Sequence, residues 1–325
     1  MRPCYVLSAI VLSLLALPAM AQLRWQQVDT GYGQMPASVR LFKTTDSLGG
    51  EPNIAYYLEA DLNDRNLEFT TDTSLGRRLT PAEFAAKNGN PLAVVNTTFF
   101  SFETHQNLGL VIRNGKLLSY NINSVYSKAD SQYHYVLPGS FGIRKNRKAD
   151  IAYVFTDSVH KRPYTLTFGA PRYKAGKPNP VLKDVVWGMP CSFARRKKRW
   201  KMETAVAGGP VLIQQGEIRI TNEAERKFMG NAINDRHPRT AIGYTAEGKL
   251  IILVIEGRYP DRAAGATLTQ EAMILRSLGC VEALNLDGGG SSCLLVNGRE
   301  TITPSDKGGQ RAIPGILLVR SKINP

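Results

Sequence analysis

An acidic residue followed by three glycines and two hydroxyl residues is the segment best suited to chemistry. It consists of Asp287, Gly288, Gly289, Gly290, Ser291 and Ser292. Glycine lets the backbone approach a ligand closely, and its exposed N–H groups and the nearby hydroxyls offer hydrogen bonds. The segment is not a nucleotide phosphate loop, which needs a lysine after its last glycine. The segment is therefore either a ligand site, with Asp287 as its acid and Gly288, Gly289, Gly290, Ser291 and Ser292 as its binding residues, or a flexible glycine hairpin.

A second carboxylate, Glu256, ends the apolar run 249–255 and is followed by Gly257 and Arg258. Between Glu256 and Asp287 the pattern predicts strand, helix and strand. A connection of this length permits a parallel pair, so the two carboxylates could lie at the same edge of a sheet. Glu256 is therefore a second acidic candidate for a site at this edge.

Ionisable groups also cluster before the predicted strand that begins near residue 240. They include Asp235, His237 and Arg239. The guanidinium fork suits bidentate recognition of phosphate or carboxylate, so Arg239 is a candidate for binding such an anion. Asp235 and His237 are further substrate-binding candidates. An ordinary surface turn is the alternative, and for His237 it is the stronger one.

Asn96 follows the apolar run 92–95 and precedes Phe99 and Phe100. A polar side chain beside aromatic rings at a strand end is typical of a ligand site. We predict that Asn96 binds sugar hydroxyl groups.

Capping signals predict two helices that help to position these residues. Thr80 and Glu83 form a capping box at the start of the first helix. Thr267 and Gln270 do so for the second, which Gly279 ends. Apolar patterns predict strands at 54–62, 92–95, 151–155, 164–168, 211–214, 249–255, 283–286, 294–296 and 316–319. The dipeptide Asn297-Gly298 should join the last two strands as a tight hairpin.

These elements predict a single α/β or α+β domain around a mixed β-sheet with flanking helices, over residues 22–325. The chain has 325 residues, of which 43% are hydrophobic and 21% charged. This composition excludes a disordered or low-complexity protein.

Residues 1–21 have the order of a secretory signal peptide: Arg2, an apolar run over 5–17, and Ala19-Met20-Ala21. The run is shorter than the ~20 residues that a membrane-spanning helix needs. We expect export to the periplasm or the medium, with no stable membrane anchor after cleavage.

The net charge of +14 comes mostly from residues 161–201, which contain 12 Lys and Arg against Asp184 alone. This proline-rich segment is either a solvated loop or a patch that attracts anionic glycans. Nucleic acid is the weakest partner, because no nucleic-acid-binding motif is present. After cleavage Cys191, Cys280 and Cys293 remain, which allows one disulfide at most and favours small buried residues.

Six motifs in this order resemble the phosphodiester glycosidase family over about residues 90–320. They are VNTTFF (95–100), GLVI (109–112), AGGP (207–210), PRTAIG (238–243), EGR (256–258) and NLDGGGSS (285–292). Many relatives have glycine or alanine in place of Thr97 and Thr98, and aspartate is frequent in place of Glu256. Compared with glycine or alanine, Thr97 and Thr98 should narrow the substrate pocket. Compared with aspartate, Glu256 should extend its carboxyl group further from the backbone.

The resemblance implies hydrolysis of a sugar linked through its anomeric carbon to a phosphate, with no cofactor required and a divalent cation left open. Asp287 would stabilise or attack the oxocarbenium-like state, and Glu256 would activate water or protonate the leaving oxygen. Arg239 and Arg258 would hold the phosphate and offset its charge. Asn96 and Ser291 would bind sugar hydroxyl groups. Exported relatives are often associated with exopolysaccharide production. Two alternatives remain: a non-catalytic protein that binds anionic polysaccharide or assists exopolysaccharide assembly, and a phosphodiesterase with a metal on Asp287, Glu256 and Asp235.

Overall fold

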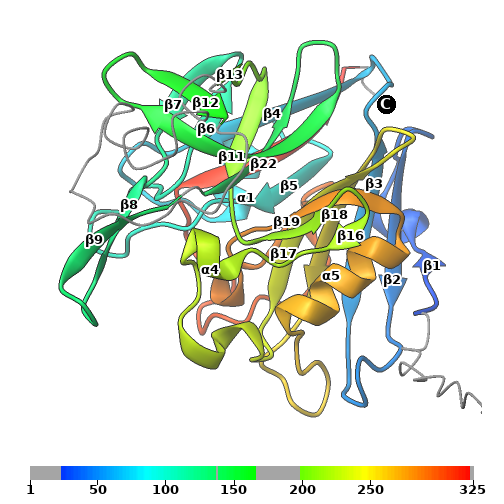
Figure 1. The fold of residues 1–325 in the computed structure, drawn as a ribbon. Coiled ribbons are helices and arrows are strands. Elements are labelled where there is room, and N and C mark those ends of the chain that lie inside the picture. Colours follow the sequence, from blue (N-terminus) through cyan, green and yellow to red (C-terminus); the bar gives the residue numbers. More distant parts are fainter. Residues whose placement is uncertain (1–22, 137, 166–197, 323–325) are drawn as a thin grey trace, which may run out of the picture.

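The computed structural model describes residues 23–136, 138–165 and 198–322, which form a protein built mainly from β-strands (Figure 1). These residues contain 22 strands and three α-helices, of which the longest has 10 residues. Every strand pair among them is antiparallel. The predicted α/β or α+β domain with a mixed sheet and flanking helices is therefore wrong.

Three large sheets and one hairpin contain the strands. The eight-stranded sheet has the order β1 (Gln26–Gln27), β2 (Val39–Thr44), β3 (Ala55–Asp61), β18 (Lys249–Ile255), β17 (Arg239–Thr245), β19 (Cys280–Asn285), β15 (Val211–Gln214), β16 (Glu217–Ile218). The seven-stranded sheet has the order β13 (Lys198–Arg199), β12 (Arg162–Thr165), β11 (Ala149–Asp157), β10 (Gly139–Ile143), β14 (Thr204–Ala207), β6 (Val111–Arg113), β7 (Lys116–Ser119). The five-stranded sheet has the order β21 (Arg299–Glu300), β20 (Leu294–Val296), β5 (Ala93–Asn96), β22 (Gly315–Ser321), β4 (Leu67–Thr73). The hairpin consists of β8 (Ser124–Ser127) and β9 (Gln132–Tyr135).

The eight-stranded sheet is covered on both faces. On one face Ile252 and Leu284 share a hydrophobic cluster with Val95 and Leu317 of the five-stranded sheet. On the other face the sheet packs against helix α5 (Leu268–Ser277), which lies in front of β17 and β18 in Figure 1. Strand β18 alternates between these layers, so that all six residues 250–255 are buried. A strand buried on both faces is apolar throughout, which explains its continuous apolar run.

Helix α1 (Pro81–Lys87) covers the outer face of the five-stranded sheet. Its Phe84 and Ala85 share a cluster with Val94, Leu295 and Leu318. The layers through this part of the protein are therefore α5, the eight-stranded sheet, the five-stranded sheet and α1. This arrangement places the end of β19 next to the end of β5.

Both predicted capping boxes are confirmed. Thr80 accepts a hydrogen bond from the Glu83 N–H, and Thr267 accepts one from the Gln270 N–H. The remaining helical elements are short: α4 (Asn222–Glu225), η1 (Asp29–Tyr32), η2 (Gly230–Ile233) and η3 (Gly289–Ser291).

The predicted strands are found, but two of their predicted pairings are wrong; one concerns β20 and β22, and the other concerns β18 and β19, which β17 separates. The turn at Asn297 and Gly298 joins β20 to β21, and the predicted hairpin between β20 and β22 is absent. Strand β5 lies between β20 and β22 and pairs with both. The predicted strand at 164–168 begins within β12, and its last three residues lie outside the described residues.

Several other predictions fall wholly or partly outside the described residues. These are the signal peptide, most of the basic segment 161–201, and Cys191. Cys280 and Cys293 are buried free thiols. No helix in the described ranges is long and apolar enough to cross a membrane.

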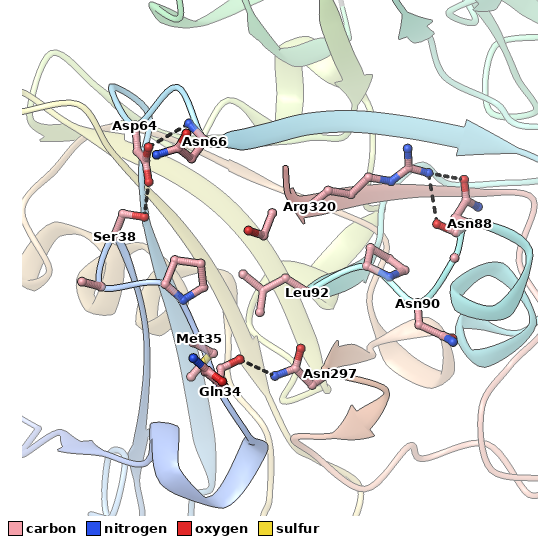
Figure 2. A pocket seen from close by; sticks show the side chains of 15 residues that line it. Gln34, Met35, Ser38, Asp64, Asn66, Asn88, Asn90, Leu92, Asn297 and Arg320 are labelled. Atoms are coloured by element: carbon pink, nitrogen blue, oxygen red, sulfur yellow. Dashed lines mark hydrogen bonds between the residues drawn. The ribbon is translucent and has the colours of Figure 1, made fainter. Parts of the chain in front are cut away.

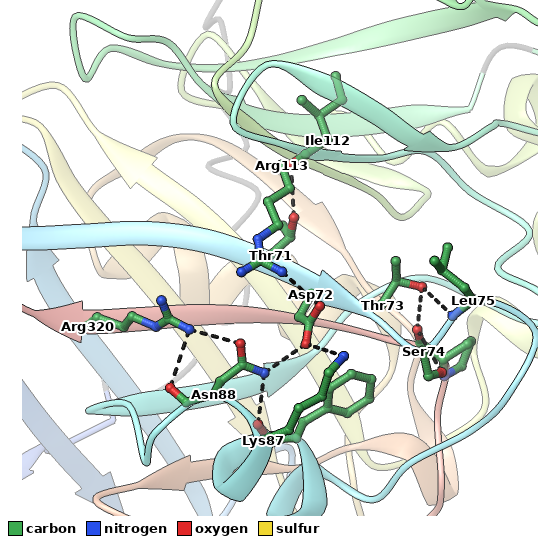
Figure 3. A network of polar contacts seen from close by, with 12 residues as sticks. Thr71, Asp72, Thr73, Ser74, Leu75, Lys87, Asn88, Ile112, Arg113 and Arg320 are labelled. Carbon is green, nitrogen blue, oxygen red and sulfur yellow. Dashed lines mark hydrogen bonds and ion pairs between the residues drawn. The ribbon is translucent and has the colours of Figure 1, made fainter.

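A buried carboxylate, Asp72 of β4, connects the five-stranded sheet to its neighbours (Figure 3). It accepts hydrogen bonds from Lys87 Nζ at 2.8 Å, Asn88 Nδ2 at 2.8 Å and Arg113 Nη1 at 3.0 Å. Burial raises the pKa of Asp72, but the hydrogen bonds from Lys87 and Asn88 outweigh burial and hold that pKa below its ordinary value. The Asp72 carboxylate therefore holds together α1, the turn after it and β6.

Replacing Asp72 with alanine should lower the free energy of unfolding at pH 7 by about 1–3 kcal/mol, because three donors lose their acceptor. Urea denaturation measures this loss. A lowered pKa means that the carboxylate stabilises the fold above its ordinary pKa, so the difference should shrink as the pH falls below about 4. Glu68→Ala is the matched control, since Glu68 lies on the same strand and pairs with Arg320 only at 3.7 Å. An equal loss in both variants would contradict the role of Asp72.

Candidate active site

Asp287 lies just after β19, where the eight-stranded and five-stranded sheets meet. Its N–H donates to the carbonyl of Thr97 at 2.8 Å, and its carbonyl accepts a hydrogen bond from Asn96 Nδ2 at 2.5 Å. Asn96 is the last residue of β5, and Thr97 follows it. The backbone of Asp287 is thus fixed by both sheets.

Asn96 is buried, and both ends of its side-chain amide bind the protein. The Oδ1 atom accepts hydrogen bonds from Thr240 Oγ1 at 2.9 Å and from the Cys293 N–H at 3.0 Å. Since Nδ2 binds the Asp287 carbonyl, the structure gives Asn96 a positioning role beneath Asp287. Its predicted contact with sugar hydroxyls would require these bonds to be exchanged.

The carboxyl group of Asp287 is half-buried. Burial raises its pKa to about 6, against a hydrogen bond from Ser291 and the positive charges of Arg311 and Lys227, which act in the opposite direction. A carboxylate with a raised pKa beside cations is a common feature of catalytic sites. At neutral pH Asp287 is mostly ionised, although burial makes its charged form less stable than it would be in water.

The glycines after Asp287 make room for two guanidinium groups. A Cβ atom on Gly289 would lie 2.8 Å from Arg258 Nη2, and one on Gly290 would lie 2.2 Å from Arg311 Nη2. Gly289 also has a φ of +60°, which favours glycine. Arg258 and Arg311 therefore lie directly on the loop that follows Asp287.

Most backbone N–H groups of this loop bind the protein itself. Gly289 N donates to the Pro238 carbonyl at 2.8 Å, and Ser291 N and Ser292 N donate to the carbonyls of Gly288 and Gly289 at 3.2 Å. A ligand at this loop would therefore be bound by the guanidinium groups of Arg258 and Arg311 more than by the backbone N–H groups.

The two serines of the motif are both buried. The Ser291 hydroxyl hydrogen-bonds to the Asp287 carboxyl group and lies 3.4 Å from Arg311 Nη1. Ser292 Oγ has no hydrogen-bond partner in the part of the chain that the structure describes. Ser291 thus orients the carboxylate, and the role of Ser292 in substrate binding stays a prediction.

Arg311 is a site residue that the sequence did not predict. It pairs with Asp306 at 2.8 Å and lies over the ring of Phe102, with its guanidinium carbon 5.4 Å from the ring centre. No sequence motif surrounds it, because it reaches the site from the loop before β22. Only the fold brings it to Gly290.

Lys227 is a second site residue that the sequence did not predict. Its Nζ lies 4.9 Å from the centre of the Phe99 ring, and its aliphatic chain lies against Gly209. Burial lowers the pKa of Lys227, whereas the carboxylates of Glu225 and Asp287 act in the opposite direction. Lys227 therefore brings a third cation to Asp287, from the segment after α4.

Glu225 fixes the segment that carries Lys227. Its carboxylate accepts hydrogen bonds from Gly139 N, Val211 N and Thr221 Oγ1, each at 2.7 Å. Burial raises the pKa of Glu225, and these hydrogen bonds oppose that effect. Gly139 belongs to the seven-stranded sheet and Val211 to the eight-stranded sheet, so Glu225 links its segment to both sheets.

Glu256 lies at the same edge of the eight-stranded sheet as Asp287, but one strand separates them. Strands β18 and β19 both run antiparallel to β17, which lies between them. The predicted direct pairing of these two strands is therefore absent, and their ends are about 10 Å apart.

The Glu256 side chain is buried and already bound on both oxygens. Oε1 accepts hydrogen bonds from Arg262, with its Nε at 2.8 Å, and Oε2 accepts one from the Thr303 N–H at 2.7 Å. Both oxygens therefore already serve protein donors, and a water or a leaving oxygen would have to displace one of them. This geometry favours a supporting role for Glu256, and its predicted catalytic role stays a prediction.

Arg239, the first residue of β17, is buried. Its Nε donates to the Ala266 carbonyl at 2.8 Å and its Nη2 to the Asp235 carbonyl at 2.9 Å. Burial lowers the pKa of Arg239, whereas Glu271 on α5 raises it. Arg239 thus supports the backbone around the site, and Arg258 and Arg311 lie nearer the loop.

Asp235 is exposed, and His237 is half-buried. The pKa of His237 is lowered by burial first and then by the charges of Arg239 and Arg258. His237 therefore lies near the two arginines, whose positive charges disfavour its own protonation. In the described ranges no three His, Cys, Asp or Glu side chains gather as metal ligands.

A family model for phosphodiester glycosidases matches residues 89–320. The bovine N-acetylglucosamine-1-phosphodiester alpha-N-acetylglucosaminidase is 26% identical over 233 residues, which are 71% of this chain and 36% of the bovine protein. The chain thus matches about a third of the length of this curated relative.

Two solved structures have a similar fold. The catalytic domain of zebrafish N-acetylglucosamine-1-phosphodiester alpha-N-acetylglucosaminidase is 22% identical with a TM-score of 0.56, covering 89% of this chain and 85% of that one. A hypothetical protein from Synechocystis is 16% identical with a TM-score of 0.58, covering 91% and 63%. The family match extends over most of the chain and spans Asp287 with the glycine loop. The chain therefore belongs to the phosphodiester glycosidase family.

Proposed function

We propose that this protein hydrolyses the bond between the anomeric carbon of a sugar and a phosphodiester. The observation that carries this proposal is the Asp287 carboxyl group, with its raised pKa, beside the cations Arg258, Arg311 and Lys227. The carboxylate suits a positively charged sugar ring, and the cations suit a phosphate. The family to which the chain belongs supports the same reaction.

In the proposed reaction the C1–O bond breaks, and the bonding electrons leave with the phosphate oxygen. Water adds its hydroxyl to C1 and gives up a proton, so that the products are free sugar and a phosphomonoester. Asp287 stabilises or attacks C1 as positive charge develops there. A phosphate is a weak base, so this leaving group needs little help from a general acid.

Arg258 and Arg311 would hold the phosphate and offset the charge that it gains. Both lie on the glycines that follow Asp287, so a phosphate bound to them would stand beside the reacting carbon. Lys227, which lies over the Phe99 ring, would add a further positive charge near Asp287. Asn96 would hold the Asp287 backbone in place during the reaction.

The proposed substrate is a phosphorylated glycan, and N-acetylglucosamine α-1-phosphodiester is the first compound to test because relatives are named for it. We also propose that the protein is exported, on the evidence of residues 1–21. N-terminal sequencing of protein from the producing cell would show whether the mature chain begins near Gln22.

Asp287→Asn should reduce kcat/KM for N-acetylglucosamine α-1-phosphodiester at least about 1,000-fold, because the amide cannot carry the negative charge. Mass spectrometry of the products also tests the bond: free sugar with phosphomonoester marks C–O cleavage. Circular dichroism and the melting temperature serve as controls for folding. At pH 8 the variant should be as stable as the wild type or more stable, since it no longer buries a charge. A folded variant with full activity would refute the proposal.

Two other results would favour the alternatives. If the P–O bond is the one that is cleaved, and if EDTA abolishes this activity, the protein would be a metal-dependent phosphodiesterase. Binding of anionic polysaccharide without any turnover would indicate a binding or assembly protein.

The pH profile of kcat/KM should fall on its acidic side with an apparent pKa of about 6, the pKa of Asp287. Activity needs the ionised carboxylate, so it is lost as the pH falls below this value. Lys227→Met should move this limb to higher pH, since the charge of Lys227 lowers the pKa of Asp287. Lys145→Met, at an exposed site, is the control and should leave the limb in place. A limb near the ordinary value of about 4 would show that Asp287 does not limit activity.

Gly290→Ala should displace the Arg311 guanidinium, because a Cβ atom there would lie 2.2 Å from Nη2. We expect kcat/KM for the phosphodiester to fall about 10- to 100-fold, with a smaller loss on a neutral nitrophenyl glycoside of the same sugar. Gly31→Ala is the control, since a Cβ atom at Gly31 would meet nothing within 4 Å and the φ of Gly31 suits any residue. Equal losses on the two substrates would show that Arg311 does not bind the phosphate.

A further inference from the structure

A cavity lies at the other end of the five-stranded sheet from Asp287. It has a volume of about 600 Å³ and is lined by residues 34–38, 64, 66, 88–92, 297 and 320–321. Figure 2 shows their side chains arranged around it. Leu92 precedes β5 and Asn297 follows β20, whereas Asn96 and Cys293 lie at the opposite ends of these strands, next to Asp287. The cavity is therefore separate from the candidate active site.

The two charged side chains of this cavity are already bound within the protein. Asp64 accepts hydrogen bonds from Ser38 Oγ at 2.5 Å and from the Asn66 N–H at 2.8 Å. The Arg320 Nη2 group donates to Asn88 Oδ1 at 2.9 Å and to its carbonyl at 3.3 Å. The Arg320 Nε atom is buried and has no hydrogen-bond partner in the described ranges. Asp64 and the Arg320 Nη2 group bind the protein itself, which leaves little free charge to attract an ion.

Three side-chain amides at the rim have no such partners. Within the described ranges, the carboxamides of Gln34, Asn66 and Asn90 make no hydrogen bond, and all three are exposed. Each carboxamide offers two donors and an acceptor. Sugar hydroxyl groups, which both donate and accept, match this combination.

The backbone that carries these amides is held rigidly. Asn90 has a φ of +52°, and its N–H donates to the Ala85 carbonyl at 2.8 Å at the end of α1. The segment at Gln34 is fixed because Asn297 Nδ2 donates to the Gln34 carbonyl at 3.1 Å. Asn88 is itself fixed by the buried Asp72 (Figure 3). A rigid site loses less entropy when a ligand binds.

The floor of the cavity is apolar. Pro91 and Leu92 are buried, and Met35 and Pro36 are half-buried beside them. The C–H faces of a sugar ring can pack on such a surface while its hydroxyls reach the amides. The volume also falls in the range of small-ligand sites.

We propose that this cavity is a binding site for an uncharged oligosaccharide, distinct from the cationic site at Asp287. The free amides would bind the hydroxyls, and the apolar floor would receive the ring faces. Such a site would hold a neutral stretch of glycan on the protein independently of hydrolysis. The proposal does not depend on the proposed function.

The test is direct binding, measured by calorimetry and by the side-chain amide signals in NMR spectra of the folded protein. The probes are chitotriose, maltotriose and mannotriose, with N-acetylglucosamine 1-phosphate as the charged comparison. At least one trisaccharide should bind with a millimolar or tighter Kd and shift the amide signals of Asn66 and Asn90. Asn66→Ala and Asn90→Ala should each weaken binding about fivefold.

Gln132→Ala removes an exposed amide on the β8–β9 hairpin and should leave binding unchanged, as should Asp287→Asn. Three results would overturn the proposal. The first is that none of the trisaccharides binds at concentrations up to about 10 mM. The second is that Asn66→Ala and Asn90→Ala, shown to be folded by their melting temperatures, bind as the wild type does. The third is that the sugar phosphate displaces the trisaccharide by binding to the same amides more tightly.

Discussion

The side-chain amide of Asn96 is the contact on which the site depends. It ends β5, and its three hydrogen bonds reach Asp287, Thr240 and Cys293, in segments that follow or belong to β19, β17 and η3. Loss of a buried hydrogen-bonding group typically costs about 1–3 kcal/mol, because the groups left behind have no water to replace it. The larger effect would be on geometry, since the Asp287 carbonyl would lose its fixed position. The Asn96 amide and the hydrogen bond from the Asp287 N–H to the Thr97 carbonyl thus give the two sheets a polar junction beside their shared apolar cluster.

The electrostatic balance at Asp287 follows from this position. Burial at the junction of the sheets opposes ionisation, and the nearby cations and Ser291 favour it, so the pKa settles at about 6. Without the cations the carboxylate would be neutral at a higher pH and of little use to a developing positive charge. Without burial its charge would be screened by water and weaker in its effect. Gly290 matters because it lets Arg311, one of these cations, come close to the loop that carries Asp287.

The elements were predictable from the sequence, but their arrangement was not. Capping residues act within one turn, so Thr80 and Thr267 revealed their helices directly. The apolar run 249–255 revealed β18, but it could not show what covers the two faces of that strand. A strand has the same apolar run whether helices cover both faces of its sheet or a helix covers one face and a second sheet covers the other. The fold class was wrong because this burial comes from sheet packing, which depends on residues distant in sequence such as Val95 and Leu317.

The site divides in the same way between local and distant residues. Asp287, the glycines and Ser291 are contiguous, so their types and order were enough to select them. Arg311 and Lys227 come from loops whose own sequences carry no motif, and they become site residues only through contacts with Gly290 and Gly209. Asn96 was selected for the right reason, a polar group at a strand end, but its partners proved to be protein atoms. A strand end places a side chain at the site, and whether it faces substrate or supports a neighbour is decided by the sheet packed against it.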